Sequence, residues 1–222
     1  MDRDRGGPVP PSPQCADPRD RPSFRLLRRG DRPAGRRGLN PGLFLSLVAQ
    51  DPFNRALLAR LPALGLRQGY LTAGCMFQAV WNHRAGRPPG WGVNDYDVFY
   101  FDDRDLSWEA EDRVIRRAAA LFRDLPARVE LRNQARVHLW YERRFGVPGP
   151  VLRSSRAGID RYPVACTCVG IALADGALYA PQGLNEIWEG VLRMNPRNPH
   201  RGMFRAKAEN YRRRWPFLRV LG

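Results

Sequence analysis

The spacing of apolar and polar residues divides the chain into two parts. Residues 1–38 have no periodic apolar positions and consist largely of arginine, proline and glycine. Such a segment buries too little apolar surface to offset the conformational entropy that it would lose on ordering. We therefore predict a disordered basic arm over residues 1–38 and a folded domain over residues 39–222.

Apolar residues recur at helical spacing along most of the folded part, which predicts amphipathic helices. Capping residues mark two of the helix starts: Asp51 precedes Pro52, and Ser107 precedes a long segment with acidic residues in its first turn. The predicted helices are two short ones within residues 40–64 and single ones over 75–83, 106–125, 133–145, 154–162, 184–194 and 203–218.

Short segments rich in β-branched and aromatic residues lie between these helices and predict strands. They cover residues 69–74, 95–101 and 127–132, and residues 166–181 form a hairpin around an Asp-Gly turn. Strands that alternate with helices, together with one hairpin, predict a mixed α/β fold in which helices cover a mixed sheet.

The chain is strongly basic, with 37 Lys+Arg against 22 Asp+Glu, and Lys207 is its only lysine. Arginine presents a planar fork suited to phosphate oxygens, so its excess indicates anionic ligands. An arginine-biased genome would give the same composition. Residues 193–222 contain nine basic residues and one acid, with aromatic residues among them. This end is either an amphipathic helix whose arginines face water or a nucleic-acid-binding patch.

Two classes of protein do not fit this sequence. No apolar run approaches the ~18 residues that a membrane span needs, and the apolar stretch at residues 42–48 is too interrupted for a signal peptide. Four cysteines in a chain of this length do not make a disulfide scaffold. We expect a cytoplasmic protein without a membrane partner.

The strongest chemical signal is a pair of acids at the start of a strand, in the segment NDYDVFYFD. Asp95 and Asp97 are two residues apart, so on a strand their side chains point to the same face. Two carboxylates that close raise each other's pKa unless a cation compensates them, and Mg²⁺ takes carboxylate oxygens. The alternative is that Asp95 belongs to the preceding turn and only Asp97 faces the sheet.

Two further features extend this signal. Gly74 and Cys75 stand between a predicted strand and a predicted helix, where glycine lets the backbone approach a ligand and the helix offers free N–H groups to phosphates. Glu130 lies in the middle of a later strand, on the face opposite Val129 and Leu131.

A glycine turn, an Asp-x-Asp pair and a later acid, in this order, resemble the nucleotidyltransferase superfamily typified by DNA polymerase beta. The segments YLTAGCMFQAVWN, NDYDVFYFD, VELRNQARVHLWY and SSRAGIDRYPVACTCVGIAL more narrowly resemble a bacterial nucleotidyltransferase-like family without a defined substrate. This resemblance covers residues 41–222 and implies a Mg²⁺- or Mn²⁺-dependent enzyme that transfers a nucleoside monophosphate from an NTP to an unidentified acceptor, which is a small molecule, RNA or protein.

The resemblance also implies roles for individual residues. Asp95, Asp97 and Glu130 are the expected catalytic residues and metal ligands. The expected nucleotide-binding residues are Gly74, Cys75, Arg128, Arg132, Asn133 and Arg136. The arginines are included because they are close to Glu130 in the sequence, and Asn133 is either a helix cap or a residue that recognises the base or the phosphates.

Two departures from the superfamily pattern bear on activity. Cys75 stands where a serine hydroxyl is usual, which removes a donor to a phosphate oxygen, and the 76–94 spacer is longer than usual, so that its loop is a candidate lid or acceptor-binding element. The alternative hypothesis is therefore a nucleotidyltransferase fold that has lost catalysis and binds nucleic acid through its arginine-rich ends.

Overall fold

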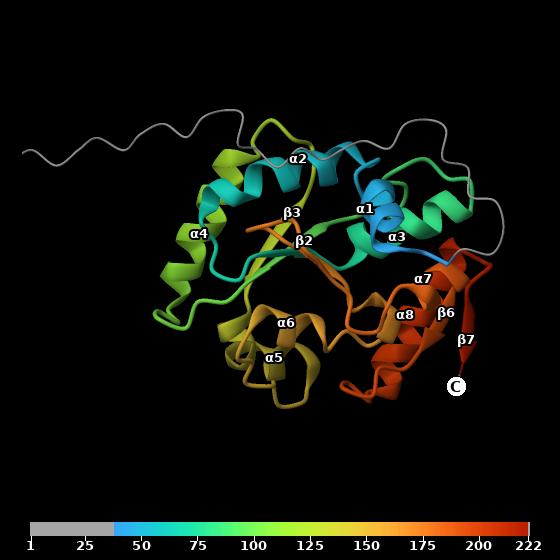
Figure 1. Ribbon diagram of the computed structural model, residues 1–222. Coiled ribbons are helices and arrows are strands. Elements are labelled where there is room, and N and C mark those ends of the chain that lie inside the picture. Colours follow the sequence, from blue (N-terminus) through green and yellow to red (C-terminus); the bar gives the residue numbers. More distant parts are fainter. Residues whose placement is uncertain (1–37, 222) are drawn as a thin grey trace, which may run out of the picture. The chain divides into compact units, whose positions relative to one another are not determined.

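The computed structural model describes residues 38–221, and Figure 1 shows how their helices and strands are arranged. The arm predicted for residues 1–38 lies outside the described residues, except for its last residue, Gly38. Among residues 38–221, none of the helices is both long enough and apolar enough to cross a membrane.

A five-stranded sheet is the centre of the structure, with the strand order β3-β2-β1-β4-β5. Its strands are β1 (Tyr70–Thr72), β2 (Tyr96–Tyr100), β3 (Val129–Asn133), β4 (Gly170–Ala172) and β5 (Leu178–Tyr179). β1 is antiparallel to both of its neighbours, β2 and β4, whereas β2 and β3 are parallel. The predicted mixed sheet is confirmed.

Eight α-helices and three short 3₁₀ helices are present among residues 38–221. The α-helices are α1 (Pro41–Val48), α2 (Pro52–Arg60), α3 (Gly74–Arg84), α4 (Trp108–Leu121), α5 (Val137–Phe145), α6 (Ser155–Ile159), α7 (Asn185–Glu189) and α8 (Arg201–Arg214). The 3₁₀ helices are η2 (Leu61–Leu64), η3 (Gln134–Arg136) and η4 (Ala165–Thr167). Both predicted caps are confirmed, because Asp51 accepts from the Phe53 amide and Ser107 accepts from the Ala110 amide.

The two faces of the sheet are covered by different elements because side chains alternate along each strand. Tyr96, Val98 and Leu131 point to one face and join the main hydrophobic cluster with residues of α1 to α4. On the other face, Ile159 at the end of α6 forms a smaller cluster with Tyr70. Figure 1 shows α5 and α6 on the opposite side of β2 and β3 from α2.

Two predictions for the C-terminal half were wrong. The helix predicted over 184–194 ends at Glu189, because Gly190 has a left-handed φ of 71° and a side chain there would meet the Phe217 ring at 2.8 Å. The next residues form β6 (Val191–Arg193), which pairs in parallel with β7 (Arg219–Leu221).

The predicted hairpin of residues 166–181 is also shorter than expected. Its first strand begins at Gly170 rather than at Cys166, which lies in η4 instead. The Thr167 hydroxyl donates to the Val164 carbonyl at 2.7 Å, and this bond fixes a tight turn in place of an extended strand.

Candidate active site

The acidic residues lie on the face of the sheet that α6 covers only in part. In the strand register, Asp97 on β2 stands between Glu130 on β3 and Thr72 on β1, and Thr72 stands opposite Gly170 on β4. Residues paired across neighbouring strands point to the same face, at a spacing of about 4.8 Å between strands. The sheet therefore sets Asp97 and Glu130 side by side, although 33 positions separate them in the sequence.

Asp95 completes this cluster from just outside the strand. It precedes β2, which begins at Tyr96, and it is half-buried, as Asp97 is. Burial raises the pKa of Asp97 to about 7, with further contributions from the charges of Asp95 and Glu130, while Lys207 and Arg132 act in the opposite direction. At neutral pH the Asp97 carboxyl is therefore only partly ionised, and a cation bound beside it would favour the ionised form.

Glu130 differs from the two aspartates because arginines already balance its charge. Arg128 forms an ion pair with one of its carboxylate oxygens at 2.5 Å, and Arg132 with the other at 3.3 Å. Over residues 38–221, no three histidine, cysteine, aspartate or glutamate side chains are gathered closely enough to hold one metal ion. Asp95 and Asp97 still fit a divalent cation, because Mg²⁺ is commonly held by one or two carboxylates together with substrate phosphates.

The N-terminus of α3 lies directly after β1, at the same end of the sheet. Ala73 precedes the helix with an unusual positive φ of 64°, and no side chain caps the first turn. Gly74 begins the helix, where an added Cβ would lie 2.6 Å from the side-chain nitrogen of Gln78. The Met76 amide donates to the Ala73 carbonyl at 3.1 Å, so the amides of Gly74 and Cys75 are the ones that can bind an anion. The missing side chain at Gly74 gives the Gln78 amide its place beside the turn.

Cys75 is placed differently from the serine that it replaces in the superfamily pattern. Its thiol is buried and donates to the Thr72 carbonyl at 3.2 Å. Burial raises its pKa well above the usual value, and the charges of Asp97 and Asp51 add to this effect. The side chain thus belongs to the core, and only the backbone amide of Cys75 is a possible contact for a ligand.

The four polar residues predicted to bind the nucleotide do not lie together. Arg128 and Arg132 lie beside Glu130 on the acidic side. Asn133 is buried, and its amide oxygen accepts from the backbone amides of Asp102 and Ala135, so the capping interpretation of this residue holds. Arg136 is buried with Glu111 as its partner, on the side covered by α4.

These positions explain which predicted residues the fold brings together. The sheet and the α3 turn gather the acids, Gly74 and Cys75, whereas Asn133 and Arg136 are occupied in contacts that hold β3 against α4. Arg128 and Arg132, each two residues from Glu130, lie on its side of the sheet, as alternation along a strand requires. Arg136 lies in η3, after the strand has ended, where alternation no longer applies and Glu111 is its partner.

Comparison with known proteins assigns the chain to a family. A family model described as nucleotidyltransferase matches residues 59–220. This chain belongs to the nucleotidyltransferase family. A solved NMR structure, described in its title as revealing a CCA-adding enzyme head domain, matches with a TM-score of 0.65 and 26% identity, over 82% of this chain and 96% of that chain. No curated protein sequence matches the chain.

Two basic residues that sequence reasoning missed act on the acidic residues of this nucleotidyltransferase from a distant part of the chain. Both residues lie on α8: the charge of Lys207 lowers the pKa of Asp97, and the charge of Asp95 raises the pKa of Arg214. No spacing or motif links α8 to the acidic strand, which lies more than a hundred residues earlier. The one available signal was that Lys207 is the only lysine in the chain.

The long spacer of this nucleotidyltransferase is fixed to the C-terminal helix. The Arg214 guanidinium donates to the Gly92 carbonyl at 2.7 Å. The Asn82 amide donates to the Trp91 carbonyl at 2.8 Å, and it accepts from the Trp215 indole at 2.9 Å. The Arg87 guanidinium lies 4.6 Å from the centre of the Trp91 ring. The end of the loop that leads into Asp95 is thus held from both sides.

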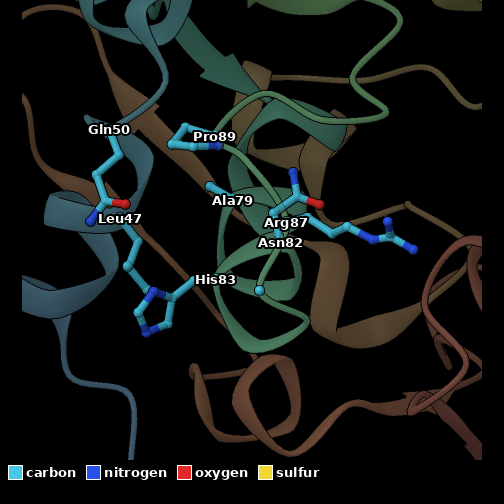
Figure 2. A pocket seen from close by; sticks show the side chains of 8 residues that line it. Leu47, Gln50, Ala79, Asn82, His83, Arg87 and Pro89 are labelled. Atoms are coloured by element: carbon cyan, nitrogen blue, oxygen red, sulfur yellow. The ribbon is translucent and has the colours of Figure 1, made fainter.

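A cavity of about 250 Å³ lies beside the start of this loop, and Figure 2 shows the side chains around it. The lining residues come from the region of α1, from α3 and from the loop, and they are Leu47, Gln50, Ala79, Asn82, His83, Gly86, Arg87 and Pro89. None of the acidic residues lines it. The cavity is therefore separate from the acidic site.

Proposed function

We propose that this nucleotidyltransferase transfers a nucleoside monophosphate from an NTP to a hydroxyl group of an acceptor, with Mg²⁺ or Mn²⁺. The observation that carries the proposal is the pairing of Asp97 with Asp95 and Glu130, next to the uncapped first turn of α3. The acidic residues suit a cation, and the first turn of α3 suits phosphate oxygens. A complex of a metal ion with a triphosphate has both groups.

Asp95 and Asp97 are the residues that would hold the metal. The raised pKa of Asp97 supports this assignment, because a bound cation would offset both the burial of the carboxylate and the repulsion from Asp95 and Glu130. When bound, the ion would neutralise phosphate charge and orient the triphosphate. The backbone amides of Gly74 and Cys75 would donate to the phosphate oxygens, and Arg128 and Arg132 would stand beside them.

The proposed transfer exchanges one bond for another. The acceptor oxygen forms a bond to the α-phosphorus, the bond from that phosphorus to the bridging oxygen breaks, and pyrophosphate leaves with its electrons. The hydroxyl proton passes to Glu130, the carboxylate next to Asp97 in the register. This step requires Arg128, whose side chain is 73% exposed, to release its ion pair with Glu130.

The alternative, a non-catalytic nucleic-acid binder, is supported by one observation. Exposed arginines, without ion pairs among the described residues, follow one side of α8 at positions 201, 205 and 212. These positions are one and three turns apart on the same flank of the helix. A binder of this kind would need the arginines and would not need Asp95 or Asp97.

Thermal melting of the full chain with each of four NTPs, with and without Mg²⁺, tests the proposal. Wild-type protein is expected to melt higher with one NTP and Mg²⁺ together, since ligand at 100 times its Kd adds about 2.7 kcal/mol to the free energy of unfolding. The double variant Asp95→Asn/Asp97→Asn should lose this increase. Asp103→Asn, an exposed acid at the other end of β2, is the matched control and should keep it.

The outcome separates the two functions. An NTP-dependent increase that persists in the double variant would contradict the metal site. No increase with any NTP, combined with salt-sensitive binding of RNA or DNA by the same double variant, would favour the nucleic-acid binder.

A further inference from the structure

Helix α8 carries two different basic flanks. Its buried stripe consists of Phe204, Ala208 and Tyr211, and the Tyr211 ring packs on Phe77 and Trp81 of α3. One flank, beside this stripe, holds Lys207, Asn210 and Arg214 at positions i, i+3 and i+7. The other flank holds the exposed arginines described above. The helix therefore presents different cations on its two sides.

The flank with Lys207 faces the acidic site. Arg214, at its C-terminal end, donates to the carbonyl of Gly92, three residues before Asp95. The Trp215 ring packs on Trp81 and the Tyr211 ring packs on Phe77, so α8 runs in the same direction as α3 and its earlier residues lie toward the first turn of α3. Lys207, two turns before Arg214 on the same flank, therefore lies toward that end, in agreement with its lowering effect on the pKa of Asp97. The flank thus runs from the loop before Asp95, where Arg214 is bonded, toward the first turn of α3, where Lys207 lies.

The cations around the acids differ in how they are occupied. Arg132 forms an ion pair with Glu130. Arg214 is held by the Gly92 carbonyl and by the side-chain oxygen of Asn210. Lys207 is exposed, and within residues 38–221 it has neither an ion pair nor a hydrogen bond from its side chain. Its ammonium group is free to bind a ligand.

We propose that Lys207 binds the phosphates of the ligand at the acidic site. This inference rests on the proposed function and adds to it a residue from outside the strand and turn motifs. Lysine is suited to the task because it is a compact charge on a flexible stem, and it can follow phosphate oxygens that the metal and the α3 turn leave uncovered. The ligand class is a polyphosphate chain, either free or as part of a nucleotide.

The test measures binding of inorganic tripolyphosphate and of each NTP, with Mg²⁺, to full-length variants by calorimetry. Lys207→Gln is expected to weaken tripolyphosphate binding at least tenfold, because a charge-assisted hydrogen bond is lost. Lys207→Arg should remain within about threefold of wild type, since the charge is kept. Arg205→Gln, the same loss of charge on the opposite flank of α8, is the matched control and should change binding less than twofold. Melting temperatures of all variants should match wild type, because both residues are exposed.

Each outcome decides the question. If Lys207→Gln and Arg205→Gln weaken tripolyphosphate binding equally, Lys207 contributes only to the overall positive charge of α8, and the proposal is overturned. NTP binding that requires Asp95 and Asp97 but not Lys207 would overturn the proposal and leave the function standing. Tripolyphosphate binding through Lys207, without selectivity for any NTP, would support the proposal and count against nucleotidyl transfer. Absence of any polyphosphate binding by wild-type protein would overturn both.

Discussion

The guanidinium of Arg214 donates a hydrogen bond of 2.7 Å to the carbonyl of Gly92, and so α8 holds the loop that leads into Asp95. Arg214 also lies with its guanidinium 4.6 Å from the centre of the Trp215 ring, which packs edge-on against Trp91. Burial lowers the pKa of Arg214 from its usual value, although the Tyr211 and Asp95 charges oppose this. The residue acts on the site by position rather than by contact with the ligand.

Loss of this bond should disturb both the fold and the site. Arg214→Gln is expected to lower the free energy of unfolding by roughly 1–2 kcal/mol, because a hydrogen bond from a charged donor is lost. It should also weaken Mg²⁺-dependent NTP binding, since Asp95 follows the loop. Chemical denaturation and calorimetry measure the two effects, with Arg213→Gln, an exposed neighbour, as the control. Unchanged NTP binding in a destabilised Arg214→Gln protein would show that the loop does not position Asp95.

Asp97 should reduce the stability of the metal-free protein. Its pKa is raised to about 7 in the folded state, so the protonated form is favoured there, and its contribution to stability falls as the pH rises from about 4 to about 7. Asp97→Asn is expected to raise the free energy of unfolding at pH 8, in EDTA, by roughly 1–4 kcal/mol. The difference from wild type should shrink toward pH 4. A variant less stable than wild type at pH 8 would contradict the repulsion between the acids.

Gly74 should tolerate no side chain without a loss of function. Gly74→Ala places a Cβ 2.6 Å from the side-chain nitrogen of Gln78, whose amide must then shift into the space at the α3 turn. We expect a stability loss of about 1 kcal/mol and a larger loss of NTP binding, measured by denaturation and calorimetry. Gly202→Ala in the first turn of α8 is the control, since its added Cβ meets nothing closer than 3.4 Å. Normal NTP binding by Gly74→Ala would exclude phosphates from this turn.

Cys75→Ser tests whether the serine that is usual in the superfamily would raise the affinity for NTP. The buried thiol points to the Thr72 carbonyl, and a hydroxyl would make the same bond. We therefore expect NTP affinity within about twofold of wild type and a stability change of about 1–2 kcal/mol. Affinity that rises tenfold in Cys75→Ser, and not in Cys75→Ala, would show that the hydroxyl reaches the ligand instead.

Local patterns predicted most of the fold, and the limits of the prediction have physical causes. The caps at Asp51 and Ser107 and the alternation in β3 are local signals, and the structure has them as expected. The β6–β7 pair joins segments nearly thirty residues apart, so no local pattern shows it, and helical spacing continued past the break at Gly190. Long-range pairing overrode local preference there.

The same reasoning applies to the site. The acidic pair and the glycine turn are short motifs and were visible in the sequence, whereas Lys207 and Arg214 reach the acids only through the packing of α8 on α3. Arg136 is close to Glu130 in the sequence but far from it in role, because the chain leaves β3 at Asn133 and turns in η3, where Arg136 pairs with Glu111. Residues that act from another element are found only once the tertiary contacts are known.

The bond between Arg214 and Gly92 joins residues 122 positions apart, which has a consequence for biosynthesis. During translation, the acidic strand leaves the ribosome long before α8 is made. Contacts of such large sequence separation form slowly, because the intervening chain must first be brought together. A nascent chain therefore carries its acids before α8 is made, and the loop that leads into Asp95 is fixed only after α8 has formed.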